Sequence, residues 1–299
     1  MSAMQMAASE DALGRTKINM NIDFFRVEDV AGGRIGFRDA MREALRVRGR
    51  NRSCMVWGEP VGLFEGHEDG NLIEGEVGRI RMTDTPSIGS RECVLEEIPL
   101  NEEQGIAERT AFLYDSGRRV LVIHARREAV SAARLCGYCD VFARNSVETF
   151  TLVPILRSDV QNQFKSMNVI KSVDVKFSKA SQTTLAGADI STKSFVTGLS
   201  NLNGATLHVT VSAGAGKEKR LSFQNAYNLI ENALRQREDS VERLVVSGRN
   251  AGDQRLVLDL LEARLRVKRQ VEFRGRSATY EQRRSNVRRA YESNLPLLN

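Results

Sequence analysis

The sequence predicts an α+β protein with mainly antiparallel sheets, a few helices and two domains. Segments in which apolar and polar residues alternate recur along the chain, as expected for strands with one buried face. Several such segments follow one another directly, with only an occasional helix between them, which favours antiparallel neighbours. The chain has 299 residues, of which 41% are hydrophobic and 27% charged, a composition typical of globular proteins.

The elements of the N-terminal half follow from these patterns. We expect, in order, a strand at 18–24, a helix at 37–47, short strand pieces at 55–57 and 72–73, a β-hairpin at 112–114 and 120–123, an alanine-rich helix at 127–142 and a strand at 149–155. The hairpin is indicated by the turn residues Asp115, Ser116 and Gly117 between two apolar runs.

The C-terminal half continues the same mixture. We expect a short helix at 158–166 with Ser158 or Asp159 as its cap, and a helix that Ser222 caps. The expected strands are at 169–177, 207–211, 241–246, 256–261 and 264–274, with a loop or weak helix at 178–204 and a turn at 248–253. The chain then closes with a helix, because Thr279 and Gln282 fit a capping box.

The expected organisation is a short disordered tail at 1–13, an N-terminal α+β domain at 14–150 and a C-terminal α+β domain at 151–299. No apolar run approaches the roughly 20 residues that span a bilayer, and the first residues do not have the pattern of a secretory signal. Four cysteines do not indicate a disulfide scaffold, so a reducing cytoplasm is expected.

Positive charge is concentrated near the C-terminus. Residues 264–289 contain ten basic and two acidic residues, a net charge of +8 against +6 for the whole chain. The ten are Arg264, Arg266, Lys268, Arg269, Arg274, Arg276, Arg283, Arg284, Arg288 and Arg289. Charge of one sign in such density favours a polyanion as partner, and nucleic acid is the simplest polyanion in a cell.

The basic strand at 264–274 alternates, with Arg264, Arg266 and Lys268 on its polar face and Arg269 as the exception among the apolar positions. Neighbouring cations on that face are about 6–7 Å apart, a spacing with which they could follow a phosphate backbone. A solvated strand face with protective charges is the alternative interpretation. In the closing helix, Tyr280, Val287, Tyr291 and Leu295 are expected to face the core. Its arginines would then spread over the remaining surface and bind phosphate oxygens.

Two further groups of cations join the candidate set. Arg46, Arg48, Arg50 and Arg52 follow the first helix, where they could equally form an exposed arginine-rich loop. Lys217 and Lys219 lie beside Gly214 and Gly216, which invites comparison with a phosphate-binding loop. That motif requires glycine at position 211 and serine or threonine at 218, where this chain has Val211 and Glu218. A plain strand-to-helix loop is therefore favoured, with lysines that could still contact phosphates.

Motifs for catalysis are weak. Cys136 and Cys139 have the spacing of a redox dithiol or half a zinc site, but they fall inside a helical pattern and the other ligands are missing. Asp174 and Lys176, with Asp159 upstream, could belong to a metal-dependent nuclease, or could simply lie on the polar side of a strand. The residues predict a binding protein rather than an enzyme, with no cofactor and no small-molecule substrate.

The order of segments resembles a known family. The matching segments are Phe112-Leu113-Tyr114-Asp115-Ser116-Gly117, Leu152-Val153-Pro154-Ile155-Leu156-Arg157, Val169-Ile170-Lys171-Ser172-Val173-Asp174-Val175 and Ala251-Gly252-Asp253, followed by the basic strand and helix. Over roughly residues 105–299 the chain is similar to the Rex A-like phage-exclusion proteins of lambdoid prophages. The basic character of that family is matched here by Arg264, Arg266, Lys268 and the terminal arginines. The pair Cys136/Cys139 and the cluster Arg42–Arg52 do not map onto it.

The resemblance implies a homodimeric protein of the bacterial cytoplasm that senses phage DNA during abortive infection and acts through a separate membrane protein. Charge and resemblance together predict binding of double-stranded DNA without sequence preference. Two alternatives stay open: a metal-dependent defence nuclease, and an interaction module whose arginines meet an acidic protein partner.

Overall fold

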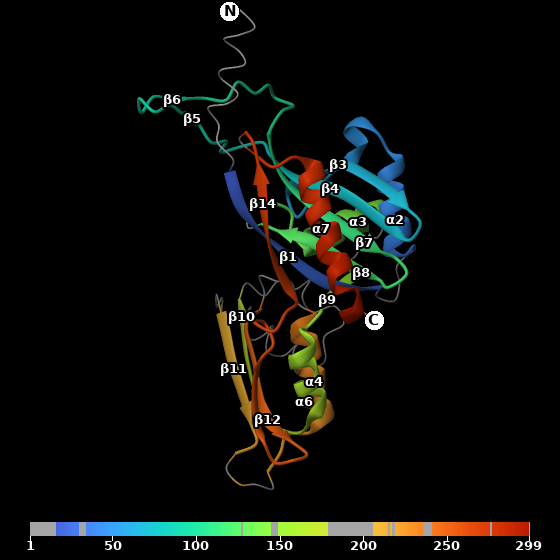
Figure 1. Ribbon diagram of the computed structural model, residues 1–299, viewed down its shortest axis with the longest axis vertical. Coiled ribbons are helices and arrows are strands. Elements are labelled where there is room, and N and C mark those ends of the chain that lie inside the picture. Colours follow the sequence, from blue (N-terminus) through green and yellow to red (C-terminus); the bar gives the residue numbers. More distant parts are fainter. Residues whose placement is uncertain are drawn as a thin grey trace, which may run out of the picture.

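A computed structural model describes residues 16–29, 34–126, 128–144, 149–178, 206–214, 216, 219–235, 241–275 and 277–298. In these residues, two antiparallel sheets each carry helices, and they lie one above the other in Figure 1. The predicted α+β fold is confirmed. The tail expected at 1–13 and nearly all of the loop expected at 178–204 lie outside the described residues. None of the helices in the described ranges is both long and apolar enough to cross a bilayer.

The first sheet has eight strands in the order β14-β1-β8-β7-β4-β3-β2, with β9 also paired to β1. Their bounds are β1 (Thr16–Asp29), β2 (Ser53–Val56), β3 (Glu59–Asp69), β4 (Leu72–Arg81), β7 (Ile106–Asp115), β8 (Val120–Ala125), β9 (Phe150–Pro154) and β14 (Arg266–Phe273). All the pairings are antiparallel. A separate small hairpin, β5 (Ile88–Gly89) and β6 (Leu95–Glu96), lies between β4 and β7.

Both faces of this sheet are buried. Met20, Ile22 and Phe24 of β1 pack on one side with helix α7 (Tyr280–Asn294), which ends in a 3-10 turn, η3 (Leu295–Leu297). Phe25 and Val27 pack on the other side with α2 (Phe37–Arg46) and α3 (Ala132–Phe142). Successive side chains of a strand point to opposite faces, so β1 contributes to both cores. A second 3-10 turn, η1 (Gly49–Arg52), leads from α2 toward β2.

Strand β4 passes close to its neighbours at Gly75. A methyl group at this position would lie 2.7 Å from the carbonyl oxygen of Glu65 and 2.8 Å from the ring of Phe112. Real Cβ atoms do not make such contacts, so glycine is required where the Phe112 ring crosses the strand.

The second sheet has the order β11-β10-β12-β13. Its strands are β10 (Met167–Ser178), β11 (Thr206–Ser212), β12 (Val241–Asn250) and β13 (Arg255–Asp259). Helices α4 (Ser158–Ser166) and α6 (Phe223–Leu234) pack on the face formed by Val173, Val175 and the neighbouring apolar residues. The intervening positions of β10, such as Asp174, point to the other face.

The last strand and helix correct the expected division at residue 150. β14 pairs with β1 over Asp23–Thr16 and α7 packs on the first sheet, although both lie in the range 151–299. The second sheet is therefore an insertion between β9 and β14. The two segments that connect the parts run side by side. Two backbone hydrogen bonds join them, Leu265 N to Ile155 O at 2.7 Å and Arg157 N to Ala263 O at 2.8 Å.

Several local boundaries differ from the sequence expectations. The strand piece at 55–57 falls at the end of β2 and the piece at 72–73 at the start of β4, and the long strand β3 between them was not expected. Helix α3 begins at Ala132, where Ser131 caps it, rather than at 127. Helix α4 is preceded by Arg157, and neither Arg157 nor Ser222 of α6 makes a side-chain cap. The capping box of Thr279 and Gln282 is confirmed.

Candidate nucleic-acid interface

Three of the four arginines of α7 point inward, which contradicts their expected place on the outer surface. Arg283, Arg284 and Arg288 form ion pairs with Glu74 and Glu76 of β4, two carboxylates that are almost completely buried. Glu74 and Glu76 alternate with apolar residues of β4 and face α7 from beneath it. The three arginines therefore attach the C-terminal helix to the sheet and are committed to internal partners.

Glu74 is held by several groups at once. Arg288 Nε donates to its Oε1 at 2.8 Å and Arg284 Nε to its Oε2 at 2.9 Å. The Nε2 atom of His67 lies 3.2 Å from the same Oε2. Burial raises the pKa of the Glu74 carboxyl, but the hydrogen bonds from Arg288 and Arg284 outweigh it, so this pKa lies below its ordinary value.

Glu76 has a second arrangement of the same kind. Arg283, itself buried, places Nε 2.7 Å and Nη2 2.5 Å from Glu76 Oε1, and its Nη1 also donates to the carbonyl of Ala278. Arg109 of β7 approaches the other carboxylate oxygen at 3.1 Å. Removing two carboxylates from water costs several kcal/mol each, and the arginines offset that cost only by staying in place.

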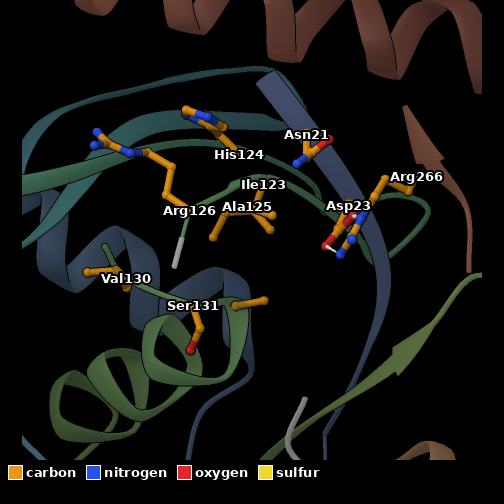
Figure 2. A pocket seen from close by; sticks show the side chains of 10 residues that line it. Asn21, Asp23, Ile123, His124, Ala125, Arg126, Val130, Ser131 and Arg266 are labelled. Carbon is orange, nitrogen blue, oxygen red and sulfur yellow. Dashed lines mark hydrogen bonds and ion pairs between the residues drawn. The ribbon is translucent and has the colours of Figure 1, made fainter. Parts of the chain in front are cut away.

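Arg266 also has an internal partner. Its guanidinium donates from Nε to Oδ1 of Asp23 at 2.5 Å and from Nη2 to Oδ2 at 2.6 Å, and Asp23 is buried. Figure 2 shows this pair at one end of a cavity of about 270 Å³ between β1, β8 and the start of α3. Arg126 extends toward the opposite end, and His124 points away from Ser131. Arg264 is half-buried, where the chain crosses between the two parts.

The remaining cations of β14, and Arg274 directly after it, have a different environment. Lys268 and Arg274 are exposed, Arg269 is half-exposed, and none of the three makes an ion pair within the described residues. β14 is the last strand of its sheet, and β1 beside it adds the exposed Lys17. We call Lys17, Lys268, Arg269 and Arg274 the edge cations. Arg289 is exposed on α7, and Arg276 lies outside the described residues.

The early cluster lies at the opposite edge of the sheet. Arg46 is the last residue of α2, and Arg48, Arg50 and Arg52 follow it beside β2 and β3, whereas β14 forms the other end of the strand order. Arg46 pairs with Glu43 and Arg50 with Glu103, while Arg52 donates to the carbonyls of Val47 and Leu45. Arg48 is exposed. The two basic clusters predicted from the sequence therefore do not form one surface.

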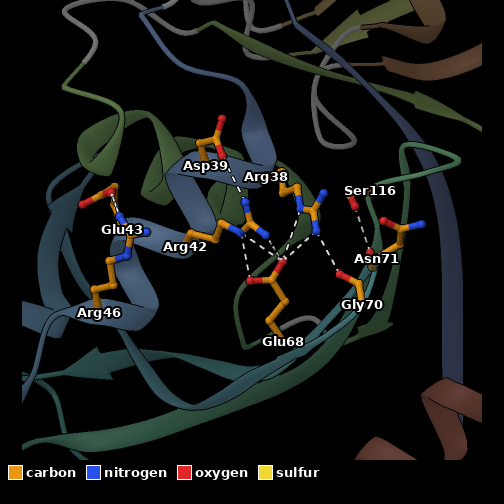
Figure 3. A network of polar contacts seen from close by, with 9 residues as sticks. All are labelled: Arg38, Asp39, Arg42, Glu43, Arg46, Glu68, Gly70, Asn71 and Ser116. Carbon is orange, nitrogen blue, oxygen red and sulfur yellow. Dashed lines mark hydrogen bonds and ion pairs between the residues drawn. The ribbon is translucent and has the colours of Figure 1, made fainter.

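Figure 3 shows how the same helix is fixed to the sheet. Arg38 and Arg42 of α2 both donate to Glu68 at the end of β3, and Arg38 also donates to the carbonyl of Gly70 at 2.9 Å. The Arg42 hydrogen bond is the main cause that lowers the pKa of the Glu68 carboxyl. These arginines, too, serve the fold.

The lysines of the glycine loop lie in the second part of the molecule. Lys219 is exposed ahead of α6, and Lys217 falls outside the described residues. The ammonium of Lys171 donates to the carbonyl of Gly216 at 2.9 Å and to that of Lys219. The Lys171 ammonium therefore lies where a phosphate-binding loop would place the phosphate, which favours an ordinary loop between a strand and a helix.

The carboxylates of the nuclease hypothesis are separated by the second sheet. Asp174 points to the face away from α4, and Asp159 lies on α4 itself. Asp174 accepts from Arg243 at 2.7 Å and lies 2.5 Å from His208 Nε2. Lys176 pairs with Glu242. In the described ranges, no group of three His, Cys, Asp or Glu side chains could hold a metal ion.

The cysteine pair is buried. Cys136 and Cys139 lie on the core side of α3, and Cys139 Sγ is 3.1 Å from the sulfur of Met41. Burial raises the pKa of the Cys139 thiol well above its ordinary value, and that of Cys54 to about 11. Thiols with such pKa values are poor nucleophiles at neutral pH.

Sequence reasoning missed one feature, the segment 82–105 between β4 and β7. It carries six acidic residues and one basic residue, and its tip exposes Ile88, Val94 and Leu95. In Figure 1 it extends far from the body of the molecule. The sequence feature that could have revealed this segment is the run of acidic residues between two paired strands.

A comparison with protein families finds a match over most of the chain. Residues 64–295 match a family of unknown function, DUF6731, and this range contains the acidic segment, the second sheet, β14 and the whole of α7. None of the curated proteins matches the chain.

Proposed function

This chain belongs to the family of unknown function DUF6731, and we propose that it binds double-stranded DNA without sequence preference through the exposed edge of β14. One observation carries the proposal. Lys268 and Arg269 lie on the terminal strand of a sheet and Arg274 directly follows it, all three free of ion pairs in the described residues, with Lys17 on the adjacent strand. Such cations contribute most to the free energy of DNA binding when they displace counterions from the phosphate backbone, because no internal acid competes for them.

This interface is smaller than the set of sixteen cations predicted from the sequence. Arg266, Arg283, Arg284 and Arg288 are committed to buried carboxylates. Four edge cations would release about four counterions, so the logarithm of the binding constant should fall with a slope of about −3 to −4 against the logarithm of the salt concentration. Between 50 and 200 mM salt, that slope corresponds to a loss of affinity on the order of 100-fold.

The experiment is a salt titration of binding to a labelled random duplex, followed by fluorescence anisotropy. The test variant is Lys268→Ala/Arg269→Ala/Arg274→Ala. The matched control is Arg46→Ala/Arg48→Ala/Arg50→Ala, which removes the same charge at the opposite edge of the sheet. We expect the test variant to lose at least tenfold in affinity and to have a flatter slope, and the control to stay near the parent protein. Equal losses in both would mean that net charge, rather than the β14 edge, binds DNA.

The wider role that we propose is sensing of phage DNA in prophage-encoded exclusion, with self-association and a separate membrane effector. Its support is the resemblance of segment order over roughly residues 105–299. A phage plaque assay tests it: cells that express the protein with its neighbouring genes should exclude a second phage, and the β14 triple variant should not.

A second candidate function is binding of an acidic protein partner. The observation that favours it is the exposed acidic segment 82–105, which shows that an anionic protein surface is available on this chain itself. Nuclease digestion of the sample separates the two: a complex that survives it is held by protein and not by DNA.

A further inference from the structure

Residues 82–105, here called the arm, leave the first sheet between Arg81 and Ile106, which are paired across β4 and β7. The arm extends beyond the end of the molecule where β1 begins and β14 ends (Figure 1). Its tip is the β5–β6 hairpin. Ser90 organises the connection, because its Oγ accepts from the backbone of Glu92 and Val94, each at 3.2 Å.

The tip exposes large apolar side chains to water, which is unfavourable unless a partner covers them. Leu95 is 75% exposed, Val94 50% and Ile88 46%. An isolated two-stranded hairpin is marginal in water, and ordering each residue costs roughly 1–2 kcal/mol of conformational entropy. A projecting hairpin with an apolar tip is therefore expected to gain most of its stability from a partner that covers it.

The negative charge of the arm indicates that the partner surface is basic. The arm has a net charge of −5, so the other residues of the chain together have +11. Residues 264–275, which contain β14, hold five basic residues and one acidic residue. β14 is also a terminal strand, whose outer backbone groups form no strand pairing in the described part of the chain. An edge strand of this kind is a template for another strand.

We propose that the arm of one copy docks on the β14 edge of a second copy of this chain. The acidic residues Glu96 and Glu97 would meet Lys268 and Arg274, and the apolar tip would be covered by the partner. Because the arm and the end of β14 lie at the same end of the molecule, one twofold axis allows both arms to dock at once. The inference does not depend on DNA binding, and it is tested without DNA.

Cross-linking between two distinguishable chains tests the contact directly. Cys93 is exposed on the arm, and Gln270 is exposed on β14. A tagged chain with the native Cys93 is mixed with an untagged Cys93→Ser/Gln270→Cys chain and treated with a short bis-maleimide. We expect a mixed, tagged–untagged dimer on a denaturing gel. The control chain, Cys93→Ser/Gln161→Cys, places the cysteine on α4 and should give at most one tenth of that product. Equal yields from the two would overturn the proposal.

Oligomeric state gives a second, independent readout by sedimentation equilibrium. Replacing 83–104 by Asn-Gly joins β4 to β7 through a short turn and should raise the dimer dissociation constant at least tenfold. Glu96→Lys/Glu97→Lys should do the same in the intact chain, and adding Lys268→Glu/Arg274→Glu should restore the dimer by exchanging the charges. A parent protein that stays monomeric, a dimer that survives loss of the arm, or a charge exchange that restores nothing would each overturn the proposal.

Discussion

Arg266 of β14 donates two parallel hydrogen bonds, 2.5 Å and 2.6 Å long, to the carboxylate of Asp23 on β1. The two residues are neighbours in the β1–β14 register, although 243 positions separate them in the sequence. The pair shows that a cation on the polar side of a basic strand can belong to the fold rather than to a ligand.

For Arg266→Ala we expect a loss of about 1–3 kcal/mol of unfolding free energy, because Asp23 stays buried without its partner while Arg266 itself is half-exposed. Urea denaturation measures this loss. Lys268→Ala, the comparison on the same strand, should change stability by no more than about 0.5 kcal/mol. Equal stability of the two variants would contradict the role given to Asp23.

In α7, Arg283→Ala should cost about 3–5 kcal/mol, since it leaves the buried Glu76 without its main partner. Arg289→Ala is the matched control, with the same substitution in the same helix at an exposed position. It should stay within about 0.5 kcal/mol of the parent protein. The midpoints of urea unfolding, at equal slopes, compare the two. A small effect of Arg283→Ala would mean that α7 is held by its apolar face alone.

The buried His124 should make the protein sensitive to mild acid. Burial, with Arg126 and Arg283 nearby, lowers the pKa of this imidazole to about 4. Its ordinary value is about 6.5, so the unfolded chain takes up the proton first as pH falls, and stability is lost between these values. We expect about 2 kcal/mol of loss between pH 7 and pH 5 from this group. Chemical denaturation across that range should show a shallower dependence in His124→Leu, and an unchanged dependence would refute the assignment.

Gly75→Ala should destabilise by about 1–3 kcal/mol, because the added methyl meets the Glu65 carbonyl and the Phe112 ring. Gly62→Ala, in the next strand, is a fair control, since a methyl there would find its nearest atoms at 3.7 Å. Thermal unfolding followed by circular dichroism distinguishes them. Similar melting temperatures for both would show that β4 relaxes around the methyl.

DNA and the arm are expected to compete if both use β14. A duplex added before the bis-maleimide should lower the yield of the mixed dimer between Cys93 and the cysteine introduced at position 270. The same concentration of free nucleotide, which has too few phosphates to hold the edge, is the control. An undiminished yield at saturating DNA would place the two partners on different surfaces.

The local part of the fold was accessible from the sequence. The alternation at 264–274 and the Thr279–Gln282 capping box correctly located β14 and α7. The hairpin β3–β4 was largely missed, because Gly66, Gly75 and Gly78 interrupt its strands with a residue type that is depleted in strands. Glu74 and Glu76 keep the alternation of β4, but they face the arginines of α7 rather than solvent.

The candidate site was less predictable for the same reason. Whether an arginine faces solvent or a buried acid depends on a partner that can be distant in the sequence, as Glu74 is 210 positions from Arg284 and 214 from Arg288. Counting charge along the sequence placed ten cations in one group. The tertiary structure separates those that pair with buried acids, such as Arg283, from those that face solvent, such as Lys268. A pattern of period 3.6 locates the buried stripe of α7, and Arg283 lies in that stripe, three positions after Tyr280 and four before Val287. Its charge led to the expectation that it faces solvent.

The pairing of β1 with β14 has a consequence for synthesis on the ribosome. The second sheet with its helices, at 156–263, is complete before β14 and α7 emerge, so it can fold while the nascent chain is still growing. The first sheet must wait, with Glu74 and Glu76 uncompensated until the arginines of α7 leave the exit tunnel. Translation that stops early would therefore yield one finished lobe and one open sheet, a natural substrate for chaperones and proteases.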